Sequence, residues 1–318
     1  MSKCEPGTLP SEAPMTVSSA AISADGRTLV TGEKAGSVRL WTLDPKRTGA
    51  APSLALAGNA AGPRGELRDV AIAPDGRYVV AAGDDGLLVW DTKDPQKGES
   101  AAKALMKGQA CLALALGSDG VTLAAATSAG VYLWDVRTGL KIREEPVVAG
   151  AGIRALALSA SGDPSAGPRR LAVAIDRGIT VVDLVSKETS TESEAHNAGI
   201  YSLAFDAGGR HLATGGDAGR VKVWTVKSNE KGLELEKRTE MTGHTDTVKV
   251  LHFTRDGQSL ISGGQDHTAI VWDPATGQER ALLAAHTDRI VELGVSPRDG
   301  SLISIGRDGT MKRWRATE

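Results

Sequence analysis

Short stretches of alternating hydrophobic and polar residues recur along this chain, and each is followed by a turn and a second apolar stretch. The pattern is clearest in AISADGRTLVTG, AIAPDGRYVVAAG, AFDAGGRHLATGG and HFTRDGQSLISGG. Alternation with a period of two is typical of half-buried β-strands, and Asp-Gly or Gly-Gly pairs supply the positive-φ residues that hairpin turns need. The pattern therefore predicts a β-hairpin that is repeated along the chain.

A third predicted strand ends at a tryptophan in six of the repeats. The tryptophans stand at positions 41, 90, 134, 224, 272 and 314, and Val182 occupies the same local context in the one long gap. These seven slots are 42 to 49 residues apart, close to the period of about 40 to 45 residues of a four-stranded propeller blade. With a weaker fourth strand after each slot, the sequence predicts an all-β fold, a seven-bladed β-propeller of four-stranded antiparallel blades over residues 15–318.

The last predicted blade needs a fourth strand from elsewhere, because the sequence ends four residues after Trp314. The N-terminal segment, residues 1–14, is the spare piece, and we expect residues 3–12 to pair beside the last tryptophan strand. Proline at positions 6 and 10 is compatible with an outermost strand, which leaves one edge without hydrogen bonds. This pairing would close the ring of blades without a covalent bond.

Polar residues at fixed places in the last two repeats resemble the WD40 repeat family. The sixth repeat has Gly243-His244, Asp256-Gly257, Ser262, Asp266 and Trp272-Asp273, and the seventh has His286, Asp299-Gly300, Ser304, Asp308 and Trp314. The resemblance covers the chain after residue 14, and the high Ala, Gly and Arg content is similar to that of prokaryotic proteins. The resemblance to the WD40 family implies a structural tetrad in each of these two blades. A hydroxyl accepts a hydrogen bond from the indole N–H and is bonded to one His nitrogen, and Asp accepts a hydrogen bond from the other His nitrogen. The tetrads would be His244, Ser262, Asp266 and Trp272 in blade six, and His286, Ser304, Asp308 and Trp314 in blade seven.

The other repeats depart from this pattern. Blade five has His196, Thr214 and Trp224 but Ala218 where the Asp is expected, and blade one has Ala35 at that place. Blades two to four lack the Gly-His pair and are expected to depend on apolar packing alone. We therefore expect uneven stability, with blades five to seven more stable than blades two to four.

Composition narrows the class of protein. The 37 basic and 39 acidic residues nearly cancel, so no strong field would attract nucleic acid or an anionic membrane. Cys4 and Cys111 are too far apart in sequence for a CxxC motif, and no apolar run approaches the ~18 residues of a membrane span. We expect a cytoplasmic, monomeric domain that binds neither nucleic acid nor membrane.

No motif for catalysis or cofactor binding is present. The sequence has no GxSxG, GxGxxG, HExxH or phosphate-binding GxxxxGK[ST] pattern. Three histidines, at 196, 244 and 286, recur at one repeat position, but each belongs to a different blade, whereas zinc ligands must converge within ~2 Å of one ion. We predict no catalytic residue, no cofactor and no metal site.

The resemblance also implies a binding face. In WD40 proteins the start of the first strand of each blade faces the top rim around the central channel, where partners dock. The matching positions in this sequence offer a cation in four of seven blades and an acid in one, Glu66. We predict a rim for acidic or phosphorylated peptides, formed by Arg68, Arg154, Tyr201, Lys249 and Arg289.

The sequence thus favours a non-catalytic scaffold that binds protein or peptide partners. One alternative is a propeller enzyme, a hydrolase or lyase acting at the channel mouth, and another is a regulatory or sensory domain of a larger protein such as a kinase. Three insertions that break the repeat period are expected to be surface loops: residues 58–65, 161–168 and 227–237.

Overall fold

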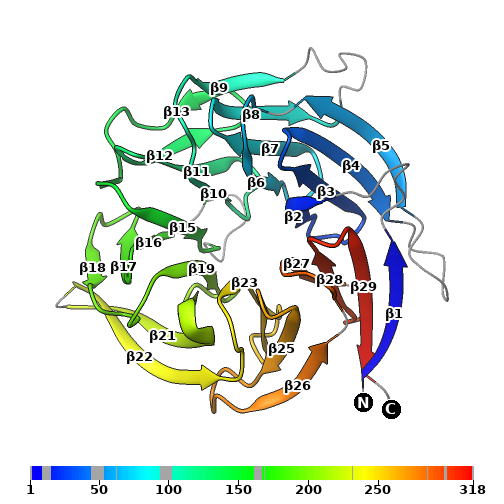
Figure 1. The fold of residues 1–318 in the computed structure, drawn as a ribbon. Coiled ribbons are helices and arrows are strands. Elements are labelled where there is room, and N and C mark those ends of the chain that lie inside the picture. Colours follow the sequence, from blue (N-terminus) through cyan, green and yellow to red (C-terminus); the bar gives the residue numbers. More distant parts are fainter. Residues whose placement is uncertain are drawn as a thin grey trace.

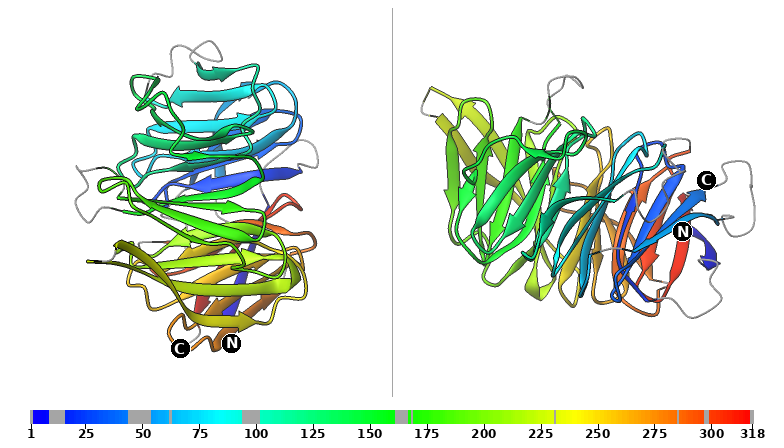
Figure 2. Two further views of the ribbon diagram at one scale, coloured as in Figure 1. Left: turned by 90° about the vertical axis from the view of Figure 1, so that its left-hand side faces the viewer. Right: turned by 90° about the horizontal axis from the view of Figure 1, so that it is seen from above.

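Seven antiparallel sheets are arranged radially around a central axis (Figure 1). The computed structural model describes residues 2–8, 16–43, 54–61, 63–93, 102–160, 167, 169–230, 232–284, 286–296 and 299–316. From the side, the strands run between the two ends of a short cylinder, where the connecting loops gather (Figure 2). The predicted fold class, a seven-bladed β-propeller of four-stranded blades, is confirmed.

In each blade the strands follow one another outward from the axis. Blades one and two consist of β2 (Val17–Ile22), β3 (Thr28–Glu33), β4 (Ser37–Leu43) and β5 (Leu54–Ala61), and of β6 (Leu67–Ile72), β7 (Tyr78–Gly83), β8 (Gly86–Asp91) and β9 (Lys103–Lys107). In blade three the outer position is divided between two short strands, so the blade consists of β10 (Ala113–Leu116), β11 (Thr122–Thr127), β12 (Gly130–Asp135), β13 (Leu140–Lys141) and β14 (Val148–Ala149).

The next three blades repeat this order. Blade four consists of β15 (Ile153–Leu158), β16 (Arg170–Ile175), β17 (Gly178–Asp183) and β18 (Thr189–Glu192). Blade five consists of β19 (Ile200–Phe205), β20 (His211–Gly216), the 3-10 turn η2 (Asp217–Gly219), β21 (Arg220–Asn229) and β22 (Gly232–Thr242). Blade six consists of β23 (Val248–Phe253), β24 (Leu260–Gly264), β25 (Thr268–Trp272) and β26 (Glu279–Ala284).

Blade seven joins the two ends of the chain. Its inner strands are β27 (Ile290–Val295), β28 (Leu302–Gly306) and β29 (Thr310–Ala316), and its outermost strand is β1 (Ser2–Thr8), which lies beside β29 in Figure 1. β1 and β29 are antiparallel, with Ser2 opposite Ala316 and Thr8 opposite Thr310. Residues 9–12 of the segment expected to close the ring lie outside the described residues.

The tryptophan slots have the same register in every blade, and their side chains are buried among apolar residues of neighbouring blades. Because a single sheet cannot cover its own two apolar faces, this burial between blades holds the ring together. In each case the slot residue on the third strand lies opposite an apolar residue on the second: Trp41 and Leu29, Trp90 and Val79, Trp134 and Leu123, Val182 and Leu171, Trp224 and Leu212, Trp272 and Leu260, and Trp314 and Leu302.

The insertions are less loop-like than expected. Residues 227–229 end β21 and residues 232–237 begin β22, so this insertion lengthens a β-hairpin. Leu233 is buried and Leu235 packs on the same apolar cluster, which explains why the segment pairs rather than protrudes as a loop. Residues 58–61 belong to β5, and of residues 161–168 the structure describes only residue 167.

The described residues contain no helix with the length and apolar character that a membrane span requires.

Candidate binding site at the channel mouth

A cavity of about 330 Å³ lies on the propeller axis, where the first strands of all seven blades begin. These strands, β2, β6, β10, β15, β19, β23 and β27, are the ones nearest the centre in Figure 1. The structure brings all five residues predicted for the top rim into the wall of this cavity, which we call the channel mouth: Arg68, Arg154, Tyr201, Lys249 and Arg289.

The ring of Tyr201 contacts two of these cations, which come from the blades on either side of its own. Lys249 Nζ lies 3.8 Å from the ring centroid and Arg154 Cζ lies 5.1 Å from it. Arg154 Nη1 also donates a hydrogen bond of 3.0 Å to the Tyr201 hydroxyl. Cation–π contacts of this kind hold the two positive groups in place at the mouth.

The cations differ in how well their charges are compensated. Arg68 pairs with Asp84 at 2.7 Å, and Arg154 approaches Asp176 at 3.5 Å. Among the described residues, Lys249 and Arg289 have no carboxylate oxygen within 4.0 Å. Burial, together with repulsion from Arg289, lowers the pKa of Lys249, and burial lowers the pKa of Arg289. A bound anion would relieve both effects, because it stabilises the charged forms.

Two carboxyl groups lie close to the same axis. Asp69 lines the channel mouth and accepts hydrogen bonds from Ser19 Oγ at 3.0 Å and from the Leu114 amide at 3.3 Å, which links three blades. Burial raises the pKa of Asp69 to about 6, and burial with the nearby Asp69 charge raises that of Glu292 to about 8. Glu292 is therefore mostly neutral at pH 7, whereas Asp69 is mostly ionised, so one negative charge faces the four cations of the mouth.

The sequence reasoning missed these two carboxyls. Both stand two residues after the first apolar residue of their strands, Leu67 and Ile290, whereas only the positions directly flanking that residue were considered. The equivalent positions in the other blades hold only Ser, Ala or Val. That contrast is the signal that could have singled out Asp69 and Glu292.

Blade six contains a continuous hydrogen-bond network. Trp272 Nε1 donates to Ser262 Oγ at 2.7 Å, and Ser262 Oγ is 2.7 Å from His244 Nε2. His244 Nδ1 is 2.8 Å from Asp266 Oδ2. Burial opposes ionisation of Asp266, but its hydrogen bonds with His244, the Thr245 amide and Thr268 lower its pKa to about 2.

A glycine makes room for this network. A Cβ atom on Gly264 would lie 2.5 Å from Asp266 Oδ1 and 2.8 Å from His244 Nδ1, closer than non-bonded atoms can approach. The second Gly of the SGG sequence in blade six therefore serves the His–Asp contact.

Blade seven has the same arrangement. Trp314 Nε1 donates to Ser304 Oγ at 2.9 Å, Ser304 Oγ is 2.8 Å from His286 Nε2, and His286 Nδ1 is 3.3 Å from Asp308 Oδ2. In both blades every polar group of the network, from the indole N–H to the carboxylate, has a hydrogen-bond partner, as buried polar groups require.

The network shrinks in the other blades. In blade five Thr214 Oγ1 lies 2.7 Å from His196 Nε2 and 3.0 Å from Trp224 Nε1, without an Asp. In blade one only the pair of Trp41 Nε1 and Thr31 Oγ1 remains, at 2.8 Å. In blades two and three the indole nitrogens of Trp90 and Trp134 are buried and have no hydrogen-bond partner in the described part of the chain.

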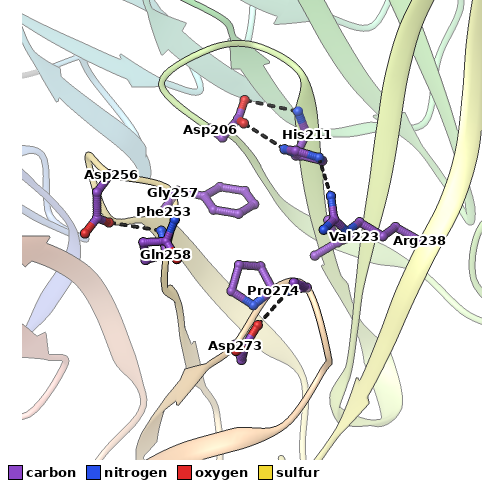
Figure 3. A pocket seen from close by; sticks show the side chains of 11 residues that line it. Asp206, His211, Val223, Arg238, Phe253, Asp256, Gly257, Gln258, Asp273 and Pro274 are labelled. Carbon is purple, nitrogen blue, oxygen red and sulfur yellow. Dashed lines mark hydrogen bonds and ion pairs between the residues drawn. The ribbon is translucent and has the colours of Figure 1, made fainter.

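A further polar cluster lies at the opposite end of the molecule, between blades five and six (Figure 3). Its cavity measures about 250 Å³. His211 Nδ1 donates to Asp206 Oδ2 at 2.8 Å, and His211 Nε2 accepts from Arg238 Nη1 at 2.7 Å. His211 begins β20 and Arg238 comes from β22, so no pattern within one strand indicates this contact.

Within the described residues, no group of three or more His, Cys, Asp or Glu side chains converges as a metal site would require.

The radial sheets and the repeated network from indole to hydroxyl define the molecule as a β-propeller built from WD repeats. Residues 6–42, 58–91, 187–225 and 235–273 each match the family model of the WD domain, G-beta repeat. The chain belongs to the WD40 repeat family.

Similar proteins come from several kinds of eukaryote. The chain is 31% identical to Coronin-7 of Homo sapiens over 133 residues, which is 40% of this chain and 14% of that protein. It is 26% identical to the chromatin assembly factor 1 subunit FAS2 homolog of Oryza sativa subsp. japonica over 118 residues, 37% of this chain and 23% of that protein. It is 28% identical to the DENN domain and WD repeat-containing protein SCD1 of Arabidopsis thaliana over 152 residues, 48% of this chain and 12% of that protein. The matched region thus spans less than a quarter of each of these relatives.

Proposed function

We propose that this chain is a non-catalytic protein-interaction platform that binds acidic or phosphorylated peptide segments at the channel mouth. The observation that carries the proposal is the convergence of four cations on one cavity, where Lys249 and Arg289 have no carboxylate partner among the described residues. Likeness to a chromatin assembly factor subunit supports a role in protein association. A rigid propeller suits this role, because contact groups that are already ordered lose less entropy on binding.

The chemistry of the mouth favours a carboxylate or phosphate over a neutral group. Charge-assisted hydrogen bonds from guanidinium and ammonium groups to these anions are about twice as strong as neutral ones. Tyr201 adds an aromatic surface beside the cations, of the kind that often anchors a peptide at a protein interface. An acidic segment would therefore find both charge and apolar contact at one place.

The test is a fluorescence-anisotropy titration with three labelled peptides of equal length, containing Glu, phosphoserine or Gln at the same positions. We expect the two acidic peptides to bind more tightly than the Gln peptide, with an affinity that falls as salt is added. The double variant Lys249→Glu, Arg289→Glu should lose at least about tenfold in affinity for the acidic peptides.

A matched control reverses two exposed cations away from the mouth, Arg143→Glu and Arg255→Glu. It carries the same change of net charge and should bind as the wild type does. Equal binding of all three peptides, or an equal loss in the control, would refute the channel mouth as the site.

A further inference from the structure

A second basic cavity lies at the end of the molecule away from the channel mouth, between blades four and five. It measures about 670 Å³, and the described residues that line it follow β15 and β19, stand at the start of β16 and β20, or belong to β21. Among the described residues that line it, four have cationic side chains, one is His211 and none is acidic: Arg169, Arg170, Arg210 and Lys227. On a chain of net charge −2, this is a local excess of positive charge that the channel mouth does not explain.

Arg170 is the buried member of this set. It is only 8% exposed, and it reaches from blade four to the Gly209 and Val226 carbonyls and, at 3.0 Å, the Ser228 hydroxyl of blade five. All three acceptors are neutral, and Arg170 Nε has no hydrogen-bond partner among the described residues. A buried guanidinium normally lies against a carboxylate or another anion, because its charge is costly to remove from water.

The other three cations differ in their partners. Arg169 Nε pairs with Asp183 at 2.9 Å, and Lys227 pairs with Glu236. The Arg210 guanidinium has no carboxylate within 4.0 Å among the described residues, although its backbone amide is bonded to Asp206. The Asp206 carboxylate already accepts a hydrogen bond from His211 Nδ1. Among the described residues, neither the Arg170 nor the Arg210 guanidinium therefore contacts a carboxylate directly, and Asp183 and Asp206 act on Arg170 only from a longer distance.

The neutral part of the wall suits an oxyanion. Gly208 and Gly209 leave room in the cavity because they have no side chains, although the Gly209 amide already donates to the Asp206 carbonyl and the Gly209 carbonyl accepts from Arg170. Ser159 and Ser228 add hydroxyl groups. A phosphate monoester carries a charge of about −1.5 to −2 at pH 7 and three acceptor oxygens. This matches two guanidiniums that contact no carboxylate directly better than a singly charged carboxylate does.

We propose that this cavity binds the phosphate group of a phosphate monoester, with Arg170 and Arg210 as its principal ligands. The site is separate from the channel mouth and does not depend on what binds there.

The experiment follows the backbone amide signals of Gly208, Gly209 and Arg210 by NMR while inorganic phosphate is added at constant ionic strength. The background is the Lys249→Glu, Arg289→Glu variant, so that binding at the channel mouth does not contribute. We expect saturable shifts of these amides below ~10 mM phosphate and no such shifts with chloride. A lack of saturable shifts, or equal shifts with chloride, would overturn the proposal.

Arg210→Ala is the first variant, because this side chain is exposed and has no partner that the fold requires. We expect it to weaken phosphate binding at least about fivefold. The matched control is Arg255→Ala, an exposed arginine in the corresponding hairpin of blade six, which should leave binding unchanged. Unchanged binding in Arg210→Ala would contradict the assignment.

Arg170→Lys tests the buried ligand in a conservative way, since Arg170→Ala removes contacts between two blades. It should weaken phosphate binding while circular dichroism shows the fold retained. A phosphoserine peptide then separates the sources of the phosphate. Tighter binding of the peptide than of inorganic phosphate indicates a phosphorylated side chain, equal binding indicates a free phosphate compound, and equal binding of a Glu peptide overturns the choice of phosphate.

Discussion

Blades six and seven have a hydroxyl on the second strand, beside the histidine and aspartate of the network, where blades two and three have alanine. In blades six and seven this hydroxyl, Ser262 or Ser304, accepts a hydrogen bond from the indole N–H of the tryptophan. The equivalent residues of blades two and three are Ala81 and Ala125, which have no acceptor for the indoles of Trp90 and Trp134. In both pairs of blades the tryptophan has the same register and is buried. Strand pairing and apolar packing are thus sufficient to place the indole, and the hydrogen-bond network stabilises a blade that is already formed.

The difference has an energetic consequence. A buried donor without a partner costs about 1 to 3 kcal/mol, so blades two and three each bear a cost that blades six and seven do not. Blade one is intermediate, since Thr31 Oγ1 accepts the indole N–H of Trp41 but no histidine extends the network. The blades that contain tryptophan therefore form a series in which the hydrogen-bond network of the indole becomes smaller, from four residues in blades six and seven to none in blades two and three.

The largest effect should come from removing the hydroxyl at the centre of the blade-six network. Ser262→Ala leaves Trp272 Nε1 and His244 Nε2 buried without a partner, so we expect a loss of about 2 to 4 kcal/mol in the free energy of unfolding. Thr31→Ala in blade one orphans the indole alone and should lose about half as much. Urea denaturation measures both, and equal losses would show that the histidine contributes nothing to the network.

Acid should destabilise blade five through His196. This imidazole is 3% exposed, and its burial, with repulsion from Lys222, lowers its pKa to about 4. Because the unfolded chain takes up this proton from about pH 6.5 and the folded chain only near pH 4, stability decreases as the pH falls through this window. By pH 5 the loss should reach about 2 kcal/mol.

The measurement compares urea midpoints of the wild type and of His196→Phe between pH 7 and pH 5. The variant should have a smaller slope of stability against pH, whatever its absolute stability. His267→Asn is the control, because that imidazole is exposed and Asn tolerates its positive φ of 67°. Equal slopes in the wild type and in His196→Phe would show that the imidazole of His196 is not the group that titrates.

The blades could be predicted from the sequence because their signals are local. Alternation and Asp-Gly turns lie within a few residues of each strand, and the repeated tryptophan slot gives the register. The location of Arg154, Tyr201 and Lys249 beside one cavity could also be predicted from the sequence. Residues at the same position of each repeat lie at the same level around the propeller axis.

The features that the sequence reasoning missed are set by contacts between blades or within long hairpins. Asp69 reaches Ser19 and Leu114 of the neighbouring blades, and no pattern within its own repeat indicates this. The alternating apolar residues Leu233 and Leu235 did carry a strand signal, but the charged residues around them favoured a loop.

Hydrogen exchange should reveal the graded series across the blades. Amides of β24 and β25 in blade six should open with a free energy at least about 1 kcal/mol higher than those of β7 and β8 in blade two. Native-state exchange followed by mass spectrometry of peptides measures this difference. Equal protection in the two blades would mean that the ring opens as one unit, and that the networks stabilise all blades together.

The smallest effect, and the sharpest test, is to supply the missing acceptor in blade three. Ala125→Ser places a hydroxyl where Ser262 stands in blade six, so Trp134 Nε1 gains a partner. We expect a gain of up to about 1 kcal/mol, because Ala125 is fully buried and the added oxygen must fit a packed interior.

Blade four provides the matched control for this gain, since its slot holds Val182 and has no indole to serve. Val173→Thr introduces a hydroxyl at the equivalent position, where a fully buried Val173 stands. It should destabilise the protein by about 1 to 3 kcal/mol, because a polar group is buried without the partner that a tryptophan would supply. Thermal unfolding of the two variants gives the comparison. If Ala125→Ser destabilises as Val173→Thr does, the unpaired indole of Trp134 does not lower the stability of blade three, and any difference in stability between the blades must come from their apolar packing.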